Sequence, residues 1–232
     1  DVAIAGVEVL VDCEGVDAFG NPAFDPEDLR LELDTSVQWT SHYASDFSMR
    51  GTLVGEFEYN CVSDLLEARD ATPPTLTVVA GPPAQAETIV SATEVYPEEE
   101  VSVTCSYFDA YGNPVDGVSS EVRVMPIGGS ASGLVIDDMS FSATGAGSYF
   151  VFCASPDQIA GDESPPEVSV LAALPFSWVV DTVEQDCYWQ DRDIPMSWIV
   201  YDAYGNLIED VQVDVTAIPA DGLIQNEDGS YR

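Results

Sequence analysis

The chain has 232 residues, of which 46% are hydrophobic, so it can fill the cores of two domains of ordinary size. Its 42 acidic residues against 6 basic ones give a formal net charge of −36, which repels nucleic-acid phosphates and anionic lipid headgroups. We therefore exclude nucleic acid as a partner, and no apolar run is long enough for membrane insertion. No basic and apolar leader opens the chain, so we expect any export signal to lie outside this sequence.

A repeat with an offset of 92 residues organises the chain. Residues 13–22 match residues 105–114, and residues 55–61 match residues 147–153. A Pro-Pro pair at the start of residues 73–80 recurs at the same offset. Landmarks that keep one spacing indicate two copies of one domain.

A third copy begins with the sequence Asp-Ala-Tyr-Gly-Asn at residues 202–206, and residues 228–231 resemble residues 147–149 of the second copy. The first copy is short at its start and the third at its end, so we expect a segment of a longer array, with about two and a half domains. We predict domains at residues 1–81, 82–173 and 174–232, which are called the first, second and third repeats.

Apolar and polar residues alternate along the chain with the period of a β-strand. The best candidate for a short helix is residues 26–33. Strands are expected, in chain order, at residues 101–107, 118–125, 149–153 and 196–200. About seven short strands in a repeat of this length are typical of an immunoglobulin-like sandwich. We therefore predict an all-β fold of tandem antiparallel β-sandwiches.

A turn sequence follows the strand that bears the first cysteine in two of the repeats and returns in the third. Its Gly and Asn tolerate positive φ, and the Asp can accept hydrogen bonds from the amides of the turn. We predict a capped turn at each occurrence, formed by Asp17, Gly20 and Asn21, by Asp109, Gly112 and Asn113, and by Asp202, Gly205 and Asn206.

Four of the five cysteines form two pairs with the same separation of 48 residues, Cys13 with Cys61 and Cys105 with Cys153. Each pair lies on strands that correspond to B and F of the sandwich, where immunoglobulin domains place their inter-sheet disulfide. We predict both disulfides and hence an oxidising compartment, the alternative being two pairs of buried free thiols. Cys187 is expected to have no partner within the chain.

The run Asp-Ala-Tyr-Gly-Asn-Pro-Val-Asp-Gly-Val at residues 109–118 resembles the bacterial immunoglobulin-like domains of the invasin and intimin type. The ending at residues 228–232 resembles the F strand of filamin-type repeats. The resemblance implies a stalk, spacer or adhesive module at the cell surface or in an extracellular fibre. Its partners would be other domains of the same array, neighbouring copies in a fibre, or a surface receptor or glycan.

The residues that support catalysis are few. His42, the only histidine, would have to serve any histidine-based zinc site or catalytic triad, and its polar surroundings predict an exposed loop. The Gly145-Ala-Gly147 run lacks the helix and lysine of a phosphate loop. We therefore predict no enzyme but a non-catalytic extracellular structural or adhesive module. The alternative is a set of accessory domains of a secreted hydrolase.

Acidic residues near the junctions between repeats are candidate Ca²⁺ ligands, because Ca²⁺ takes carboxylate oxygens and would neutralise the charge there. The alternative is a solvated acidic face. The candidates are Glu98, Glu99 and Glu100, expected near the first junction, and Asp181, Glu184 and Asp186, expected near the second. No other cofactor is expected.

Overall fold

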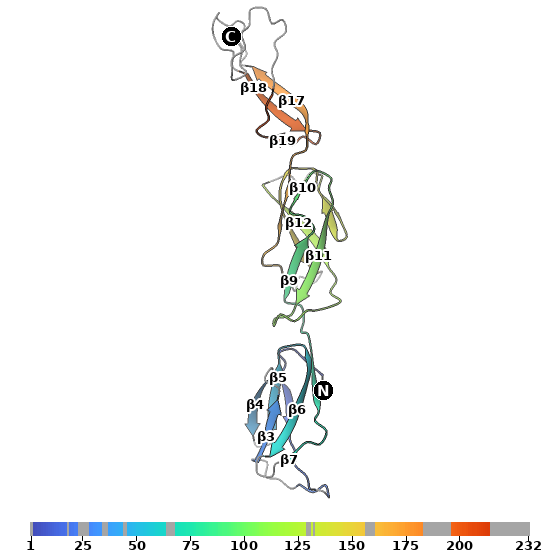
Figure 1. Ribbon diagram of the computed structural model, residues 1–232, viewed down its shortest axis with the longest axis vertical. Coiled ribbons are helices and arrows are strands. Elements are labelled where there is room, and N and C mark those ends of the chain that lie inside the picture. Colours follow the sequence, from blue (N-terminus) through green and yellow to red (C-terminus); the bar gives the residue numbers. More distant parts are fainter. Residues whose placement is uncertain are drawn as a thin grey trace, which may run out of the picture. The chain divides into compact units, whose positions relative to one another are not determined.

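The computed structural model describes residues 2–17, 19–22, 28–33, 37–43, 46–63, 68–128, 131, 133–155, 161–182 and 196–213. Contacts divide the chain into two compact units. The first consists of Asp1–Glu87, Cys105–Glu121 and Cys153–Ser164, and the second of Thr88–Thr104, Val122–Phe152 and Pro165–Arg232. Every element of the described chain is a β-strand (Figure 1). Its described residues contain no helix long and apolar enough to cross a membrane.

The first repeat forms two sheets (blue to cyan in Figure 1). One has the order β1-β8-β6-β3, with β7 also paired to β6, and the other has the order β2-β5-β4. The strands of the first sheet are β1 (Val2–Ile4), β3 (Leu29–Leu33), β6 (Gly55–Ser63), β7 (Ala68–Arg69) and β8 (Thr75–Val79). Those of the second are β2 (Val9–Asp12), β4 (Val37–Tyr43) and β5 (Asp46–Gly51). β1 runs parallel to β8, and the other pairs are antiparallel.

The side chains that these strands turn inward form one apolar core. Leu31 and Leu76 enter it from one sheet, and Phe47 and Met49 from the other. Each is at most 2% exposed. Alternate residues of a strand point to opposite faces, so the sequence period of two becomes one buried and one solvated face on each sheet.

The best helix candidate, residues 26–33, does not form a helix in its described part, because Leu29–Leu33 forms strand β3. The leucines at positions 29, 31 and 33 alternate with Arg30 and Glu32, and the strand pairs with β6 along its whole length. Burial of Leu31 in the core therefore decides the conformation of this segment over its helical propensity.

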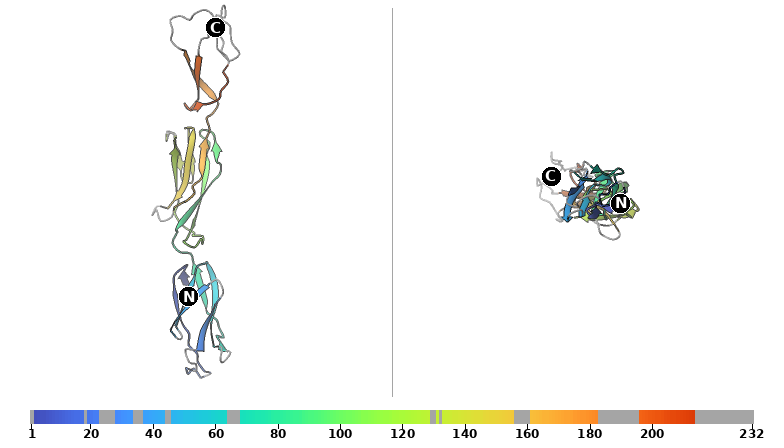
Figure 2. Two further views of the ribbon diagram at one scale, coloured as in Figure 1. Left: turned by 90° about the vertical axis from the view of Figure 1, so that its left-hand side faces the viewer. Right: turned by 90° about the horizontal axis from the view of Figure 1, so that it is seen from below.

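The second repeat uses the same strand order (green to yellow in Figures 1 and 2). One sheet has the order β10-β16-β15-β12, and the other has the order β13-β14-β11-β9. Each strand except β9 lies about 92 residues after its counterpart in the first repeat. The strands are β9 (Gln85–Val90), β10 (Glu94–Val95), β11 (Val101–Phe108), β12 (Glu121–Ile127), β13 (Val135–Asp137), β14 (Ser140–Ser142), β15 (Gly147–Ala154) and β16 (Glu167–Val170).

The described part of the third repeat is a single sheet of β17 (Pro175–Thr182), β18 (Met196–Asp202) and β19 (Leu207–Ile208). β17 and β18 pair antiparallel, in orange in Figure 2. In sequence order they correspond to β9 and β11 of the second repeat. The predicted strand at residues 196–200 is confirmed as part of β18.

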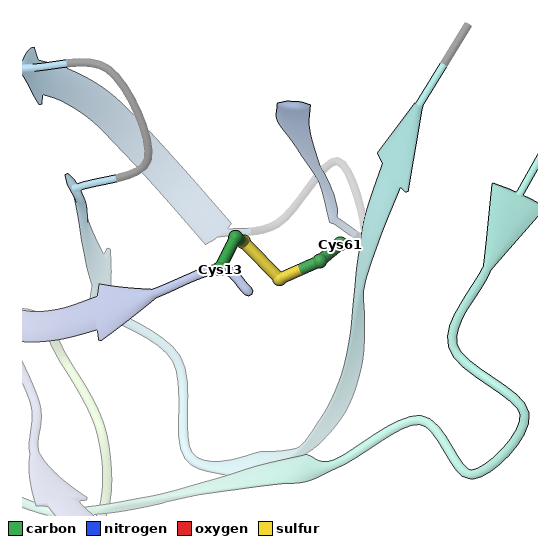
Figure 3. The surroundings of a disulfide bond; sticks show 2 residues. All are labelled: Cys13 and Cys61. Atoms are coloured by element: carbon green, nitrogen blue, oxygen red, sulfur yellow. A yellow bond between two sulfur atoms is a disulfide. The ribbon is translucent and has the colours of Figure 1, made fainter. Parts of the chain in front are cut away.

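Two disulfides lie inside the repeats. Cys13, directly after β2, is bonded to Cys61 in β6, with 5.8 Å between their Cα atoms (Figure 3). Cys105 in β11 is bonded to Cys153 in β15, with a Cα distance of 5.7 Å. In each repeat the bond ties one sheet to the other. Together with the strand order, this is the arrangement of an immunoglobulin-like β-sandwich.

Candidate functional site

The turn between β11 and β12 is closed by hydrogen bonds to one carboxylate. Asp109 Oδ1 accepts the backbone N–H groups of Tyr111 at 2.8 Å and of Asn113 at 2.9 Å. The N–H of Gly112 donates to the carbonyl of Asp109 at 3.1 Å. Gly112 has a φ of +82°, a conformation in which a Cβ is unfavourable. The Asp-x-x-Gly-Asn sequence thus specifies its own local structure.

The other two occurrences of the turn have the same internal bonds. Asp17 Oδ1 accepts the N–H groups of Phe19 and Asn21 at 2.8 and 2.9 Å. Asp202 Oδ1 accepts the N–H groups at the same two positions of the third turn at 2.9 and 2.8 Å. The Asn side chain also donates to Oδ2 of the Asp, at 3.0, 2.8 and 2.8 Å in the first, second and third turns.

The second turn also binds backbone groups of the first repeat, all within the first compact unit. Asp109 Oδ2 accepts the N–H of Gly81 at 2.9 Å. Asn113 Nδ2 donates to the carbonyl of Thr52 at 2.7 Å, and Asn113 Oδ1 accepts the N–H of Val54 at 3.1 Å. The two side chains that close the turn therefore also hold the end of the preceding repeat.

The third turn binds the second repeat in the same way, within the second compact unit. Asp202 Oδ2 accepts the N–H of Ala173 at 2.9 Å. Asn206 Nδ2 donates to the carbonyl of Thr144 at 2.8 Å, and Asn206 Oδ1 accepts the N–H of Ala146 at 2.8 Å. Each partner lies 92 residues after its counterpart at the first junction. Equivalent backbone groups of two successive repeats are thus bound by the turn that follows each repeat.

The carboxylates at both junctions are buried and ionised. Asp109 is 1% and Asp202 2% exposed. Burial disfavours the charge of Asp109, but hydrogen bonds from the Asn113 side chain and from backbone amides, including that of Gly81, outweigh it and lower the pKa to about 2. The pKa of Asp202 is lowered in the same way, with the N–H of Ala173 as the strongest of the bonds that oppose burial.

An aromatic residue of each docked turn contacts a residue with positive φ in the preceding repeat. Tyr111 lies so close to Gly6, whose φ is +81°, that a Cβ there would collide with its ring. The position 92 residues later is Glu98, whose φ is +68°, and its carboxylate hydrogen-bonds to Tyr204. This hydrogen bond, with a smaller effect of burial, raises the pKa of Tyr204.

The position of Glu98 corrects a prediction from the sequence. We expected Glu98, Glu99 and Glu100 near the first junction, but Glu98 lies against Tyr204 at the second. The reason is the direction of β11: these residues precede its start at Val101, whereas the turn of the first junction follows its end at Phe108.

The calcium ligands stay a prediction. Among the described residues, no group of three or more His, Cys, Asp or Glu side chains could hold a metal ion. Glu99 instead accepts the backbone N–H of Tyr96 through Oε2 at 2.8 Å. Asp181 lies in β17 with no description of its side chain, and Glu184 and Asp186 lie outside the described residues.

Three other predictions fall on sparsely described segments. His42 lies in strand β4 rather than in the predicted loop, at the point where the pairing of β4 with β5 shifts between Ser41 and Tyr43, and its side chain is not described. Cys187 and the filamin-like ending at residues 228–232 lie outside the described residues.

Sequence reasoning found the turns but missed what they bind. The partners Thr52, Val54 and Gly81 contribute only backbone atoms to the bonds, so side-chain identity carries no signal for them. The sequence signal that did exist was the recurrence of the turn sequence at residues 17–21, 109–113 and 202–206, which marks the turns but does not name the groups they bind.

Strand order, inter-sheet disulfides and a repeated junction turn define tandem immunoglobulin-like domains. The chain is similar in structure to the Escherichia coli adhesin FdeC, with a TM-score of 0.48 and 18% identity over 98% of this chain and 82% of that one. It is similar to invasin, a bacterial integrin-binding protein, with a TM-score of 0.43 and 14% identity over 90% of this chain and 45% of that one.

It is also similar to the D00–D0 domain of intimin, with a TM-score of 0.41 and 11% identity over 74% of this chain and 96% of that one. Invasin and intimin are the types of domain that the turn sequence resembles. No protein-family model matches the chain, and a search of the curated proteins gives no match. The assignment of the fold rests on the strand order and the disulfides.

Proposed function

We propose that this chain is a non-catalytic segment of a longer extracellular array, with immunoglobulin-like domains at residues 1–81, 82–173 and 174–232. The observation that carries the proposal is that two successive turns bind the same three backbone groups of the repeat before them. A contact that recurs atom for atom at both junctions connects each repeat to the next, and such nearest-neighbour contacts are what hold an array of repeats together.

The proposed location is the cell surface or an extracellular fibre. Its support is the pair of disulfides, Cys13–Cys61 and Cys105–Cys153, because such bonds form and persist in oxidising compartments. The partners would be other domains of the array, neighbouring copies in a fibre, or a surface receptor or glycan. Antibodies against the chain should label intact producing cells or their fibres, and labelling only after cell lysis would contradict this location.

The proposed role of the turns is to hold successive domains against their mutual repulsion. A net charge of −36 pushes neighbouring domains apart unless salt screens it. Hydrogen bonds between an ionised carboxylate and a backbone N–H are stronger than neutral ones, and two of them anchor the junctions, from Gly81 to Asp109 and from Ala173 to Asp202. Prolines at positions 82, 83 and 175 restrict the linkers further.

The test compares two asparagines in the same local setting. Both Asn113→Ala and Asn21→Ala remove the bond from the Asn side chain to the Asp of its own turn. Only Asn113→Ala also removes the junction bonds to Thr52 and Val54. We expect Asn113→Ala to speed amide hydrogen exchange at Val54 and Gly81 by about tenfold or more, since two junction bonds worth about 1 kcal/mol each are lost. Asn21→Ala should leave both amides unchanged.

The exchange is measured by NMR on the whole chain with both disulfides intact. The amide of Gly81 is the decisive probe, because its own acceptor is Asp109, which both variants leave in place. Exchange at Gly81 that is the same in Asn113→Ala as in the unaltered chain would show that the turn does not act as a connector.

A further inference from the structure

The first turn has the same Asp and Asn side chains as the two docked turns, but its described side chains are exposed. Phe19 is 89% exposed, and Asp17 and Asn21 are exposed as well. Their counterparts at the second turn include Asp109, 1% exposed, and Asn113, 5% exposed. In the described part of the chain, the hydrogen bonds of Asp17 and Asn21 stay within their own turn.

The described residues of the first turn already have the docked conformation. Gly20 has a φ of +83°, against +82° at Gly112 and +83° at Gly205 of the docked turns. The bonds onto Asp17 Oδ1 from the amides at the third and fifth positions measure 2.8 and 2.9 Å, the same as those onto Asp109. Docking would therefore require no further ordering of the described backbone of this turn, which lowers the entropic cost of binding.

We propose that the turn of Asp17, Phe19 and Asn21 docks the end of another immunoglobulin-like repeat of this type, which would continue the array of the proposed function. Asp17 Oδ2 would accept an N–H at the position of Gly81. Asn21 would donate to a carbonyl at the position of Thr52 and accept an N–H at the position of Val54. The occupant is recognised by three backbone groups in the arrangement that two repeats of this chain already present.

Phe19 narrows the choice of occupant. Phe19 occupies the same position of its turn as Tyr111, which packs on Gly6, and as Tyr204, which hydrogen-bonds to Glu98. A phenylalanine has no hydroxyl that could bond to a carboxylate such as that of Glu98, so it suits a repeat end that has glycine at this position. The docked repeat is therefore expected to have glycine, or another small residue, at the position of Gly6, and the ring would cover it.

A single substitution tests whether this turn sequence can dock. Residues 17–22 read Asp-Ala-Phe-Gly-Asn-Pro and residues 109–114 read Asp-Ala-Tyr-Gly-Asn-Pro, so Tyr111→Phe places the sequence of the first turn at the first junction. We expect amide exchange at Val54 and Gly81 to stay within about threefold of the unaltered chain, because the three junction bonds need no hydroxyl. Exchange as fast as in Asn113→Ala would overturn the proposal.

An extended chain tests the first turn itself. A copy of residues 82–173 carrying Glu98→Gly, followed by a copy of residues 82–92, is placed before Asp1, and only the leading repeat is labelled with ¹⁵N. Docking should slow exchange of its amides at the positions of Ala146 and Ala173 by about tenfold relative to the same chain with Phe19→Ala and Asn21→Ala. Equal exchange in two folded chains would refute docking.

The two experiments separate this inference from the proposed function. If Asn113→Ala changes nothing in the unextended chain, the connector itself fails. If it does open the junction but the leading repeat of the extended chain is unprotected, only the docking site at Asp17 fails. Should the leading repeat not fold, the result of Tyr111→Phe decides alone.

Discussion

Asp109 is the residue on which the first junction depends. Its two carboxylate oxygens accept four hydrogen bonds, of which three close its own turn and one, from Gly81, comes from the preceding repeat. All lone pairs that a buried carboxylate must satisfy are thereby used. Because the charged form alone accepts all four bonds, folding of the turn and docking of the repeat both favour the ionised state.

The junction should accordingly fail only in strong acid. The folded pKa of Asp109, about 2, is lowered from 3.8, so the unfolded or undocked state binds a proton more readily than the docked one. The stabilisation is then fully present above the unfolded value near pH 4 and is lost as the pH falls through about 2. We expect the amide chemical shift of Gly81 to hold between pH 7 and about pH 4 and then to titrate near pH 2.

The carboxyl ¹³C signal of Asp17 serves as the control for this titration. It changes within the same experiment but should have no effect on the Gly81 amide, because Asp17 bonds within its own turn. A midpoint for Gly81 near pH 4 would mean that Asp109 is not held in its ionised form by the junction.

The turn could be predicted from single residues, whereas the junction could not. Gly at a position of positive φ and Asp three residues before it are local requirements that the sequence states directly. The bonds to Thr52, Val54 and Gly81 depend on where the preceding repeat ends in space, and only backbone atoms accept or donate them. The relation of Tyr111 to Gly6 was equally hidden, because 105 residues separate the two positions.

At the scale of the elements, each disulfide ties one sheet of a repeat to the other. The two loops that they close have the same length, since the cysteines are 48 residues apart in both repeats. Loop-closure entropy then gives each bond about 4 kcal/mol of stabilisation. Replacing Cys105 and Cys153 together by serine should lower the free energy of unfolding by about that amount, measured in guanidinium chloride.

Peptide mapping without reduction provides the matched check. It should yield the Cys13–Cys61 and Cys105–Cys153 peptides, and Cys187→Ser should leave this pattern unchanged. A bond between Cys61 and Cys105 would mean that the strands of the two repeats are assigned wrongly.

The strands followed from the sequence wherever one face is buried. Tyr149, Val151 and Cys153 were expected on one face of a strand, and all three are buried in β15. The strand expected at residues 118–125 begins later, at Glu121, and runs on to Ile127. Residues 26–33 misled because three leucines spaced by two fit a strand as well as a short apolar helix, and only pairing with β6 decides between them.

For the whole molecule, charge is the dominant property. A formal charge of −36 on 24.9 kDa opposes every compact state of the chain. NaCl should therefore raise the melting midpoint, by a few degrees between about 0.01 and 0.5 M, as the Debye length falls from about 30 Å to below 8 Å. A midpoint that does not move with salt would show that the charges are already compensated within the fold.

Calcium at constant high NaCl separates screening from binding. Screening predicts no further rise once the ionic strength is fixed, whereas ligation by the predicted carboxylates, among them Glu98 and Asp181, predicts a rise that saturates with Ca²⁺ concentration. Differential scanning calorimetry with and without a chelator gives the comparison.

Because each turn binds main-chain atoms of the preceding repeat, the contact does not depend on the side chains of that repeat. Gly81 and Ala173 differ in side chain, as do Val54 and Ala146, yet each pair offers the same amide to the turn that follows. The sequence of a repeat can thus change at most positions without loss of the junction bonds, provided that the Asp and Asn of its turn remain. Repeats can therefore be gained or lost by recombination while the three backbone bonds of each junction stay the same, and only the aromatic residue of the turn has to match the residue that it meets.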